Sequence, residues 1–298
     1  MKILYFDCFS GVSGDMLLGA LAALGADLSL VEEELNMFLP QPVTLTAKTV
    51  VIQGITSSDV TVGNTSSAAF AGLGEVTDLI ERSSLSSEEK AAALEVFNRL
   101  ATCEARIHGV PIDHVHFHEL GAIDTIVDVV GFLLALRQLD IQEMYCSPLP
   151  MPHGLANMAH GRYPLPAPAT LELLQGIPCY GVEAEIELVT PTGAAIVSTL
   201  CQGFGPFPSM TIGKVGYGAG KNSRSDVPNL LRVVSGTIAQ SHLKEEMVGV
   251  IETNIDDMSP EYFSRLFERF FELDGALDLS VQSILMKKNR PGFQVKCL

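Results

Sequence analysis

The stretch that decides the fold reads KILYFDCFSGVSGDMLLGALAAL and spans residues 2–24. Its first part, residues 2–8, is a run of mostly apolar residues that is typical of a buried strand. Small residues over Phe9–Asp15 then predict a tight turn, and Met16–Leu24 has the composition of a helix. A strand that turns at once into a helix is a building unit of α/β proteins, so the sequence predicts an α/β fold.

Two acids flank this turn, Asp7 at the end of the strand and Asp15 at the start of the helix. In open α/β sheets, ligands bind in the crevice at the carboxyl ends of the strands, so we expect both acids to face one crevice and to be candidate catalytic residues. The helix start can also hold a phosphate, with Ser13 as a candidate contact. The alternative is a plain turn in which Ser13 or Asp15 caps the helix, because the lysine of a Walker motif is missing.

The remaining patterns continue the alternation of strands and helices. They predict a mixed sheet with flanking helices over residues 1–240, then a polar stretch at 241–246, then the beginning of a smaller α+β domain over 247–298 that stops early. A loop rich in small residues is expected at 64–74, and Thr190 is expected to cap a helix that opens at Pro191. Further helices are expected at about 30–39, 86–107, 123–134, 170–174 and 260–273, a hairpin at 43–62, and strands at about 141–149, 230–238, 248–253 and 277–286.

Composition narrows the class of protein. With 298 residues and 47% hydrophobic content, the chain can bury a large core. Its formal net charge of -16 repels nucleic acid, so we expect no nucleic-acid partner. No run approaches the roughly eighteen apolar residues of a membrane span, and the six cysteines include no Cys-x-x-Cys pair. We therefore expect a cytoplasmic protein with reduced thiols and no membrane partner.

Residues 114–128, which read HVHFHELGAIDTIVD, bring three of the seven histidines together with three carboxylates. If residues 114–118 are extended, the three imidazoles share one face of a strand. The helical spacing of apolar residues from Ile123 onward then places two of the carboxylates one turn apart on a common face. Imidazole and carboxylate together favour a first-row transition metal. The candidate metal ligands are His114, His116, His118, Glu119, Asp124 and Asp128.

Two other interpretations of this cluster stay open. The six side chains could form a hydrogen-bonded polar cluster at a domain edge, with no metal. Alternatively, only some of them are ligands, and the others orient the imidazoles or, in the case of Asp128, cap the helix.

Other segments add candidate contacts for a ligand. The proline-rich loop at 151–169 carries His153 and His160 as second-tier ligands or substrate contacts, and a surface loop with incidental histidines is the alternative. The glycine-dense stretch at 213–222 could cradle a phosphate or merely turn twice. One basic cluster in this acidic chain is the best candidate for a phosphate or nucleotide contact: Lys287, Lys288 and Arg290.

Several motifs along nearly the whole chain resemble those of the LarC family, the nickel-insertion proteins of lactate racemase maturation. The resemblance implies a nickel chelatase of the lyase class, which inserts Ni(II) into pyridinium-3,5-bisthiocarboxylic acid mononucleotide to make the nickel-pincer cofactor. It also implies that CTP, with a divalent Mn or Mg ion, is hydrolysed. The motifs are YFDCFSGVSGDM at 5–16 and the segments at 116–131, 159–170, 190–194, 252–258 and 286–292.

The end of the chain departs from the family pattern. Family chains continue well beyond the Lys-Lys-Asn-Arg-Pro-Gly motif into a region associated with CTP, whereas this sequence stops six residues after Gly292. We therefore expect the N-terminal portion of such a protein, which binds nickel and needs the C-terminal LarC portion as a partner for the CTP-dependent step. The number of bound ions and the oligomeric state, including a homo-oligomer, stay open.

Three functions are consistent with these patterns. The first is the metal-holding component of a nickel chelatase. The second is a metal-dependent hydrolase, in which a bound ion activates water and Asp7 or Asp15 supplies acid–base chemistry. The third is a non-catalytic nickel chaperone or store. The resemblance favours the first function, and the departure at the chain end moves this sequence toward the third.

Overall fold

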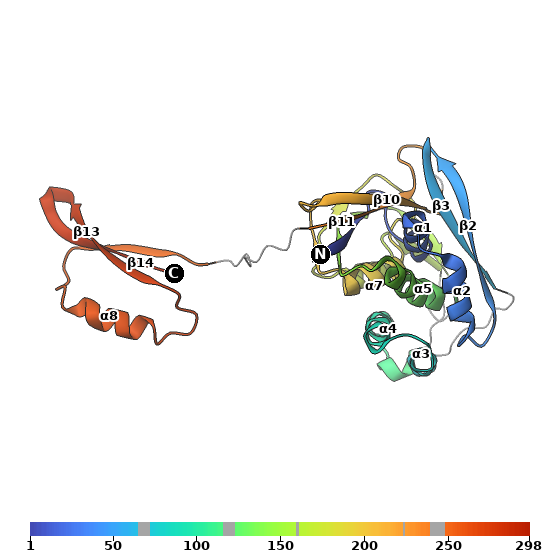
Figure 1. Ribbon diagram of the computed structural model, residues 1–298, viewed down its shortest axis with the longest axis horizontal. Helices are drawn as coiled ribbons and strands as arrows, with labels where there is room; N and C mark the ends of the chain where they lie inside the picture. The colour runs from blue at the N-terminus through green and yellow to red at the C-terminus, as the bar shows by residue number, and fades with distance from the viewer. Residues whose placement is uncertain (65–71, 116–122, 159–160, 223, 239–247) are drawn as a thin grey trace. The chain divides into compact units, whose positions relative to one another are not determined.

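The computed structural model describes residues 1–64, 72–115, 123–158, 161–222, 224–238 and 248–298. Its contacts divide the chain into two units, Met1–Gln240 and Ser241–Leu298 (Figure 1). Among the described residues, no helix is both long enough and apolar enough to cross a membrane.

A mixed sheet forms the centre of the first unit, as the sequence predicts. Within the described residues it has seven strands in the order β2-β3-β10-β11-β1-β4-β9. The central strand β1 runs antiparallel to β11 and parallel to β4. The strands are β1 (Lys2–Asp7), β2 (Val43–Ile52), β3 (Ile55–Asn64), β4 (Glu143–Cys146), β9 (Gly203–Phe204), β10 (Thr211–Ala219) and β11 (Leu230–Thr237).

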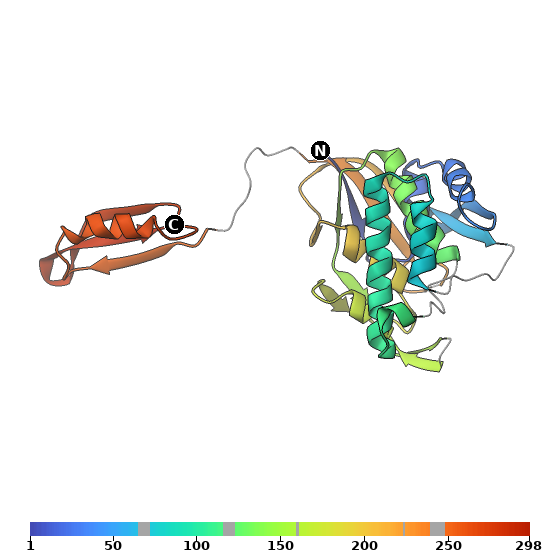
Figure 2. The same cartoon turned by 90° about the horizontal axis from the view of Figure 1, so that it is seen from below.

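Helices pack in layers against one face of this sheet, which we call the helix face (Figures 1 and 2). The helix α5 is apolar on nearly every side because it packs against helices α1, α2, α4 and α7. On the sheet side, the ring of Phe6 lies 6.1 Å from that of Phe132 in α5. The helices are α1 (Gly14–Leu24), α2 (Leu28–Asn36), α3 (Leu73–Glu81), α4 (Ser87–His108), α5 (Ile123–Leu139), α6 (Pro168–Leu173) and α7 (Pro191–Leu200).

The predicted double turn at the glycine-dense stretch is wrong, because residues 213–219 are extended, and a phosphate contact there stays a prediction. These residues belong to the strand β10, which packs directly under α1. A methyl group on Gly218 would lie 1.8 Å from the carbonyl oxygen of Met16, and one on Gly216 would lie 2.4 Å from that of Ala20. The glycines are therefore required because the helix backbone approaches the strand closely.

Local capping signals predict helix ends well. Ser86 accepts a hydrogen bond from the backbone N–H of Glu89, and the Glu89 carboxylate accepts one from the N–H of Ser86, which completes a capping box at the start of α4. The Thr190 hydroxyl likewise accepts a bond from the N–H of Gly193 at the start of α7. The sequence did not predict α3, which begins at Leu73, inside the loop expected at 64–74, most of which lies outside the described residues.

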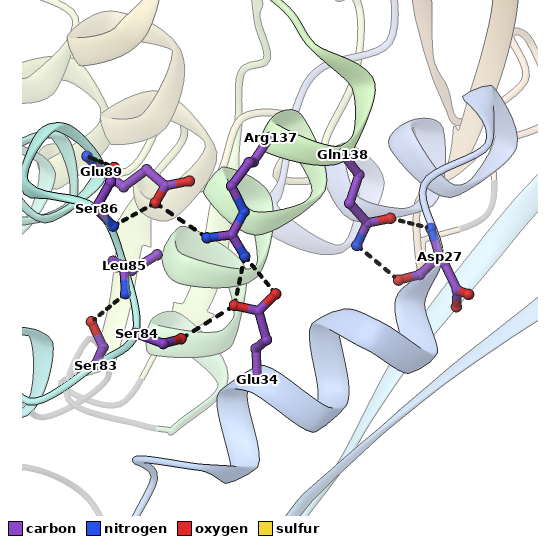
Figure 3. A network of polar contacts seen from close by, with 9 residues as sticks. All are labelled: Asp27, Glu34, Ser83, Ser84, Leu85, Ser86, Glu89, Arg137 and Gln138. Atoms are coloured by element: carbon purple, nitrogen blue, oxygen red, sulfur yellow. Dashed lines mark hydrogen bonds and ion pairs between the residues drawn. The ribbon is translucent and has the colours of Figure 1, made fainter.

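A polar network joins α2, α4 and the end of α5 (Figure 3). The guanidinium of Arg137 contacts the carboxylate of Glu34 at 2.5 Å and that of Glu89 at 3.4 Å. Gln138 binds the backbone of Asp27 through two hydrogen bonds. These groups are partly exposed, so each ion pair contributes about 1 kcal/mol or less. The network orients the last turn of α5, whose first turn carries Asp124.

Smaller elements complete the first unit. Two short strands, β5 (Leu149–Met151) and β8 (Cys179–Gly181), pair in parallel, and β6 (Leu155–Met158) pairs with β7 (Gly161–Pro164) as a hairpin. A 3₁₀ turn, η1 (Ile112–His114), follows α4.

Residues 248–298 of the second unit hold an antiparallel sheet of three strands, in the order β12-β14-β13, and one helix. The side chains of Phe263, Leu279 and Val295 form its small core between the helix and the sheet. This arrangement agrees with the predicted α+β character of the region. The elements are β12 (Ile251–Ile255), α8 (Tyr262–Phe270), β13 (Leu279–Met286), η2 (Lys287–Asn289) and β14 (Arg290–Cys297).

Candidate functional site

The loop after β1 meets the start of α5 at Gly14 and Asp128. A Cβ atom on Gly14 would lie 2.1 Å from the carboxylate of Asp128, so only glycine leaves room for this side chain. Asp128 is half-buried there, one helical turn after the exposed Asp124. The predicted position of both acids near the start of one helix is confirmed, and their meeting with the β1–α1 loop is a tertiary contact.

Several carboxylates influence one another at this point. Burial raises the pKa of Asp128 well above its usual range, and the negative charges of Asp15 and Asp124 raise it further. Burial also raises the pKa of Asp124. The ammonium group of Lys221 acts in the opposite direction on the pKa of Asp128. We call Asp15, Asp124 and Asp128 the carboxylate cluster; one nearby lysine does not balance its charge, so the cluster favours a bound cation.

Lys221 joins this cluster to the sheet. Its ammonium nitrogen lies 3.7 Å from a carboxylate oxygen of Asp15 and 2.6 Å from one of Asp59 in β3. It also donates a hydrogen bond of 2.7 Å to the carbonyl of Val60. The lysine is therefore shared between Asp15 and the β3 strand, and it neutralises only part of the charge of the cluster.

Ser13 stands at the N-cap position of α1, but its side chain makes no capping hydrogen bond. Its hydroxyl instead donates to the carboxylate of Asp15. The plain-turn interpretation named Ser13 or Asp15 as the cap: Ser13 does hold the cap position, and the Asp15 carboxylate accepts a hydrogen bond of 2.9 Å from the backbone N–H of Met16. A phosphate contact at Ser13 stays a prediction.

The histidine cluster is only partly described. His114 ends a 3₁₀ turn, in which its N–H donates to the carbonyl of Pro111, and its side chain is exposed. The expected strand over 114–118 is therefore wrong at its first residue, because Pro111 starts a turn there. His116, His118 and Glu119 lie outside the described residues. A shared face for the three imidazoles stays a prediction.

Metal-binding geometry is not complete in the part of the chain that the structure describes. No group of three or more histidine, cysteine or acidic side chains among those residues is arranged to hold a metal ion. A site with three protein ligands at the start of α5 would therefore need at least one ligand from outside the described residues.

Asp7 lies on the opposite side of the sheet from the carboxylate cluster. Side chains alternate along a strand, and Phe6 points to the helix face, so Asp7 points to the other face. There the Arg232 Nε donates a hydrogen bond of 2.8 Å to the Asp7 carboxylate. Tyr217 and Arg232 are directly paired across β10 and β11, as Arg232 and Asp7 are across β11 and β1. The expectation that Asp7 and Asp15 share one crevice is therefore wrong.

Of the two other candidate histidine contacts, the structure describes only His153. His153 is exposed, and its Nε2 lies 2.9 Å from a carboxylate oxygen of Glu183. Its backbone N–H donates to the carbonyl of Ala184. His160 lies outside the described residues. The contacts of His153 fit a histidine held at the surface by a neighbouring acid.

The basic cluster belongs to the second unit. Lys287 and Lys288 lie in the turn η2 between β13 and β14, and Arg290 begins β14. Lys288 and Asn289 have backbone φ angles of 62° and 55°, as a tight hairpin turn requires. All three basic side chains are exposed. A nucleotide contact at this turn stays a prediction.

Sequence reasoning missed Lys221 and Asp59 as members of the site. The two residues are 162 positions apart along the chain. The only local signal was the position of Lys221 at the edge of the glycine-dense stretch. Gly14 was noted as part of a turn, but its contact with Asp128 has no local signature.

Comparisons with known proteins cover nearly the whole chain. A family model described as nickel insertion protein matches residues 4–298. Proteins called putative nickel insertion proteins from Dictyoglomus thermophilum and Desulfotalea psychrophila are 47% and 48% identical to it, and the matches cover 98% of this chain and 75% of each relative. A protein from Desulfitobacterium hafniense, strain DSM 10664 / DCB-2, is 45% identical over 98% of this chain and 73% of its own length. It is named pyridinium-3,5-bisthiocarboxylic acid mononucleotide nickel insertion protein. No solved structure matches the chain.

Proposed function

Because the chain belongs to the nickel insertion protein family, we propose that it inserts Ni(II) into pyridinium-3,5-bisthiocarboxylic acid mononucleotide. The name of the Desulfitobacterium hafniense relative supports this substrate. The reaction is a metal transfer, in which nickel is the cargo and the mononucleotide is the acceptor. In this proposal, the enzyme is a chelatase of the lyase class.

The observation that best supports a cation at this site is the carboxylate cluster. Asp128 is packed against Gly14, and its pKa is raised by burial and by two neighbouring acids. A divalent cation would supply the missing positive charge and favour the ionised carboxylates. Glu119 and the histidines precede Asp124 closely in sequence, so the same segment can contribute imidazole. Imidazole with carboxylate suits Ni(II).

The proposed transfer depends on exchange of ligands. We propose that nickel is held by some of His114, His116, His118, Glu119, Asp124 and Asp128, and that the thiocarboxylate sulfurs of the acceptor then replace these protein ligands. Sulfur donors are softer than carboxylate oxygens and bind the later first-row metals well, which favours release from the protein. Imidazole must be neutral to bind nickel, so we expect the affinity to fall as the pH drops below about 6.

The CTP-dependent step is a separate part of the proposal. The resemblance to the LarC family implies CTP with Mn or Mg, and the relatives extend beyond the matched part by about a quarter of their length. We propose that this step needs the C-terminal LarC portion. Lys287, Lys288 and Arg290 are the candidate phosphate contacts that this chain would contribute.

Nickel titration by calorimetry tests the metal site directly. We expect the triple variant His114→Ala, His116→Ala, His118→Ala to lose nickel binding or to weaken it by at least about tenfold, and Asp128→Asn to weaken it less. His108→Ala is a matched control, because His108 lies in α4 and pairs with Glu104 at 3.1 Å. Unchanged stoichiometry and affinity in the triple variant would contradict the site.

A reconstituted mixture separates the three functions. Cofactor formation is measured with this chain alone, with a supplied C-terminal portion, and with neither. The chelatase predicts that formation depends on the chain, whereas a nickel store predicts metal binding with no effect on formation. Turnover of a phosphoester or amide by the isolated chain with added metals would favour the hydrolase instead.

A further inference from the structure

Three cysteines from distant parts of the chain meet inside the first unit. Cys8 follows β1, Cys146 ends β4, and Cys201 follows α7. The sulfur atoms of Cys8 and Cys146 lie 3.5 Å apart, and both side chains are fully buried. Cys201 is partly exposed and hydrogen-bonds to Cys146. We call these residues the thiol cluster; the proposed nickel transfer does not use it.

The thiol cluster favours one thiolate between two thiols. Hydrogen bonds from Cys201 and Cys8 lower the pKa of Cys146, although burial opposes this effect. Burial raises the pKa of Cys8 and that of Cys201 well above the usual range for a thiol. Cys146 is therefore the candidate nucleophile of the group, because the thiolate is the reactive form of cysteine.

Cys103 provides an internal comparison. It is also buried, and burial raises its pKa to about 12. Its thiol donates a hydrogen bond of 3.4 Å to the carbonyl of Ala169 rather than to another sulfur. Burial, together with the negative charges of Glu104 and Glu172, therefore raises the pKa of Cys103, and the sulfur neighbours distinguish Cys146 from it.

We propose that Cys8 and Cys146 form a peroxide-sensitive pair that closes to a disulfide. The Cys146 thiolate attacks one oxygen of a hydroperoxide, the O–O bond breaks, and the other oxygen leaves as water or an alcohol after taking a proton. This leaves Cys146 as a sulfenic acid. The Cys8 sulfur then attacks the Cys146 sulfur, the S–O bond breaks, and hydroxide leaves as water with the Cys8 proton. Two thiols are oxidised and one peroxide is reduced.

The geometry suits this closure. The sulfur atoms must approach by about 1.5 Å to reach a disulfide bond length of about 2.05 Å. Cys8 begins the loop that leads to Asp15, so a side-chain rotation with a small shift of this loop can supply the movement. The N–H of Cys8 is held by the hydroxyl of Ser147, the neighbour of Cys146, which keeps the two cysteines adjacent.

Peroxide titration of the full chain, followed by alkylation and tryptic digestion, tests the pair. Cys8, Cys146 and Cys103 fall in separate tryptic peptides, residues 3–48, 138–162 and 100–106. We expect a reducible link between 3–48 and 138–162 at peroxide concentrations that leave Cys103 free for alkylation. The absence of this link, or oxidation of Cys103 at the same peroxide concentration, would overturn the proposal.

Two variants identify the roles of the sulfurs. In Cys8→Ser, we expect Cys146 to be trapped as a sulfenic acid by dimedone or to link to Cys201 in the peptide 163–214, where fragmentation of the linked peptide distinguishes Cys201 from Cys179. Cys146 that stays unmodified in this variant would contradict its role as the nucleophile. Cys103→Ser is the matched control and should leave the Cys8–Cys146 link unchanged. If Cys8→Ser does not fold, the comparison of Cys146 with Cys103 in the unaltered chain still decides the proposal.

Discussion

Asp7 and Asp15 flank the same short loop, yet they reach opposite faces of the sheet and very different surroundings. The carboxylate of Asp7 is matched by a guanidinium directly across the strand pair, at 2.8 Å from Arg232 Nε. Asp15 belongs to a cluster of acids that shares one lysine with β3. The comparison teaches that two acids close in sequence can differ in role. Asp7 is compensated by its own guanidinium, whereas Asp15 shares a single lysine and belongs to a candidate ligand site.

Gly14→Ala should have the largest effect on the carboxylate cluster. The added methyl group would lie 2.1 Å from the Asp128 carboxylate, so the cluster must rearrange. We expect a loss of about 1–3 kcal/mol in the free energy of unfolding, measured with urea, together with a loss of nickel binding. Gly74→Ala in α3 is the control, because a methyl group there meets no atom within 4 Å. It should stabilise the chain by up to about 1 kcal/mol.

Arg232→Gln tests the surroundings of Asp7, on the opposite face of the sheet. Removing the guanidinium leaves Asp7 without its ion pair, and the expected cost is roughly 1 kcal/mol because the pair is partly exposed. Nickel affinity, measured by calorimetry, should not change, because Arg232 and the carboxylate cluster lie on opposite faces. A large change of nickel affinity in a folded Arg232→Gln protein, a gain above all because the Asp7 carboxylate is set free, would mean that Asp7 belongs to the metal site after all.

Asp128→Asn should alter the pH dependence of stability. The folded-state pKa of Asp128 is raised above the unfolded value of about 3.9, so the unfolded chain loses this proton first as the pH rises. Ionisation then costs stability in the folded state, and the free energy of unfolding falls between the unfolded and the folded pKa. Asparagine removes this fall, so the variant should be more stable than the parent at neutral pH while binding nickel more weakly. Urea unfolding across the pH range measures the effect, and equal slopes for the variant and the parent would contradict it.

Lys221→Met should have the smallest effect. It removes the cation that competes for the cluster, so nickel affinity should rise by about two- to fivefold, which corresponds to an exposed ion pair of about 0.5–1 kcal/mol. Lys214→Met makes the same change of charge at a lysine that donates instead to the carbonyl of Leu24, at the far end of α1. Calorimetry should show no change of affinity for Lys214→Met, and an equal gain in both variants would indicate a general effect of net charge.

Most of the fold follows from local patterns. The turn and helix over residues 8–24, the hairpin at 43–62 and the capped helices at Ser86 and Thr190 are formed by contacts between residues close in sequence. Such contacts leave a signature in periodicity and in capping residues, which is why the sequence predicts them. The family could be predicted because its motifs are also short stretches of sequence. The candidate ligands at 114–128 could be predicted because histidine and acidic residues bind metals.

The site could be predicted only in part. Asp124 and Asp128 lie at the start of one helix as expected, because helical spacing is local. The sequence did not predict that Asp7 and Asp15 lie on opposite faces of the sheet. Side chains alternate along a strand, but only the packing of helices decides which of the two faces they cover. The glycines of β10 were misread as a turn. They are required because the backbone of α1 packs against them, and this contact is not visible in the local sequence.

By itself, then, the sequence determined most of the elements, the family and the list of chemical groups. Tertiary structure alone decided which groups meet: Asp7 with Arg232 across 225 residues, Lys221 with Asp59 across 162, and Cys8 with Cys146 across 138. The physical reason is that these pairs are made by strand order and by helix packing on the sheet. Both depend on burial of the whole apolar core, and no short window of sequence records them.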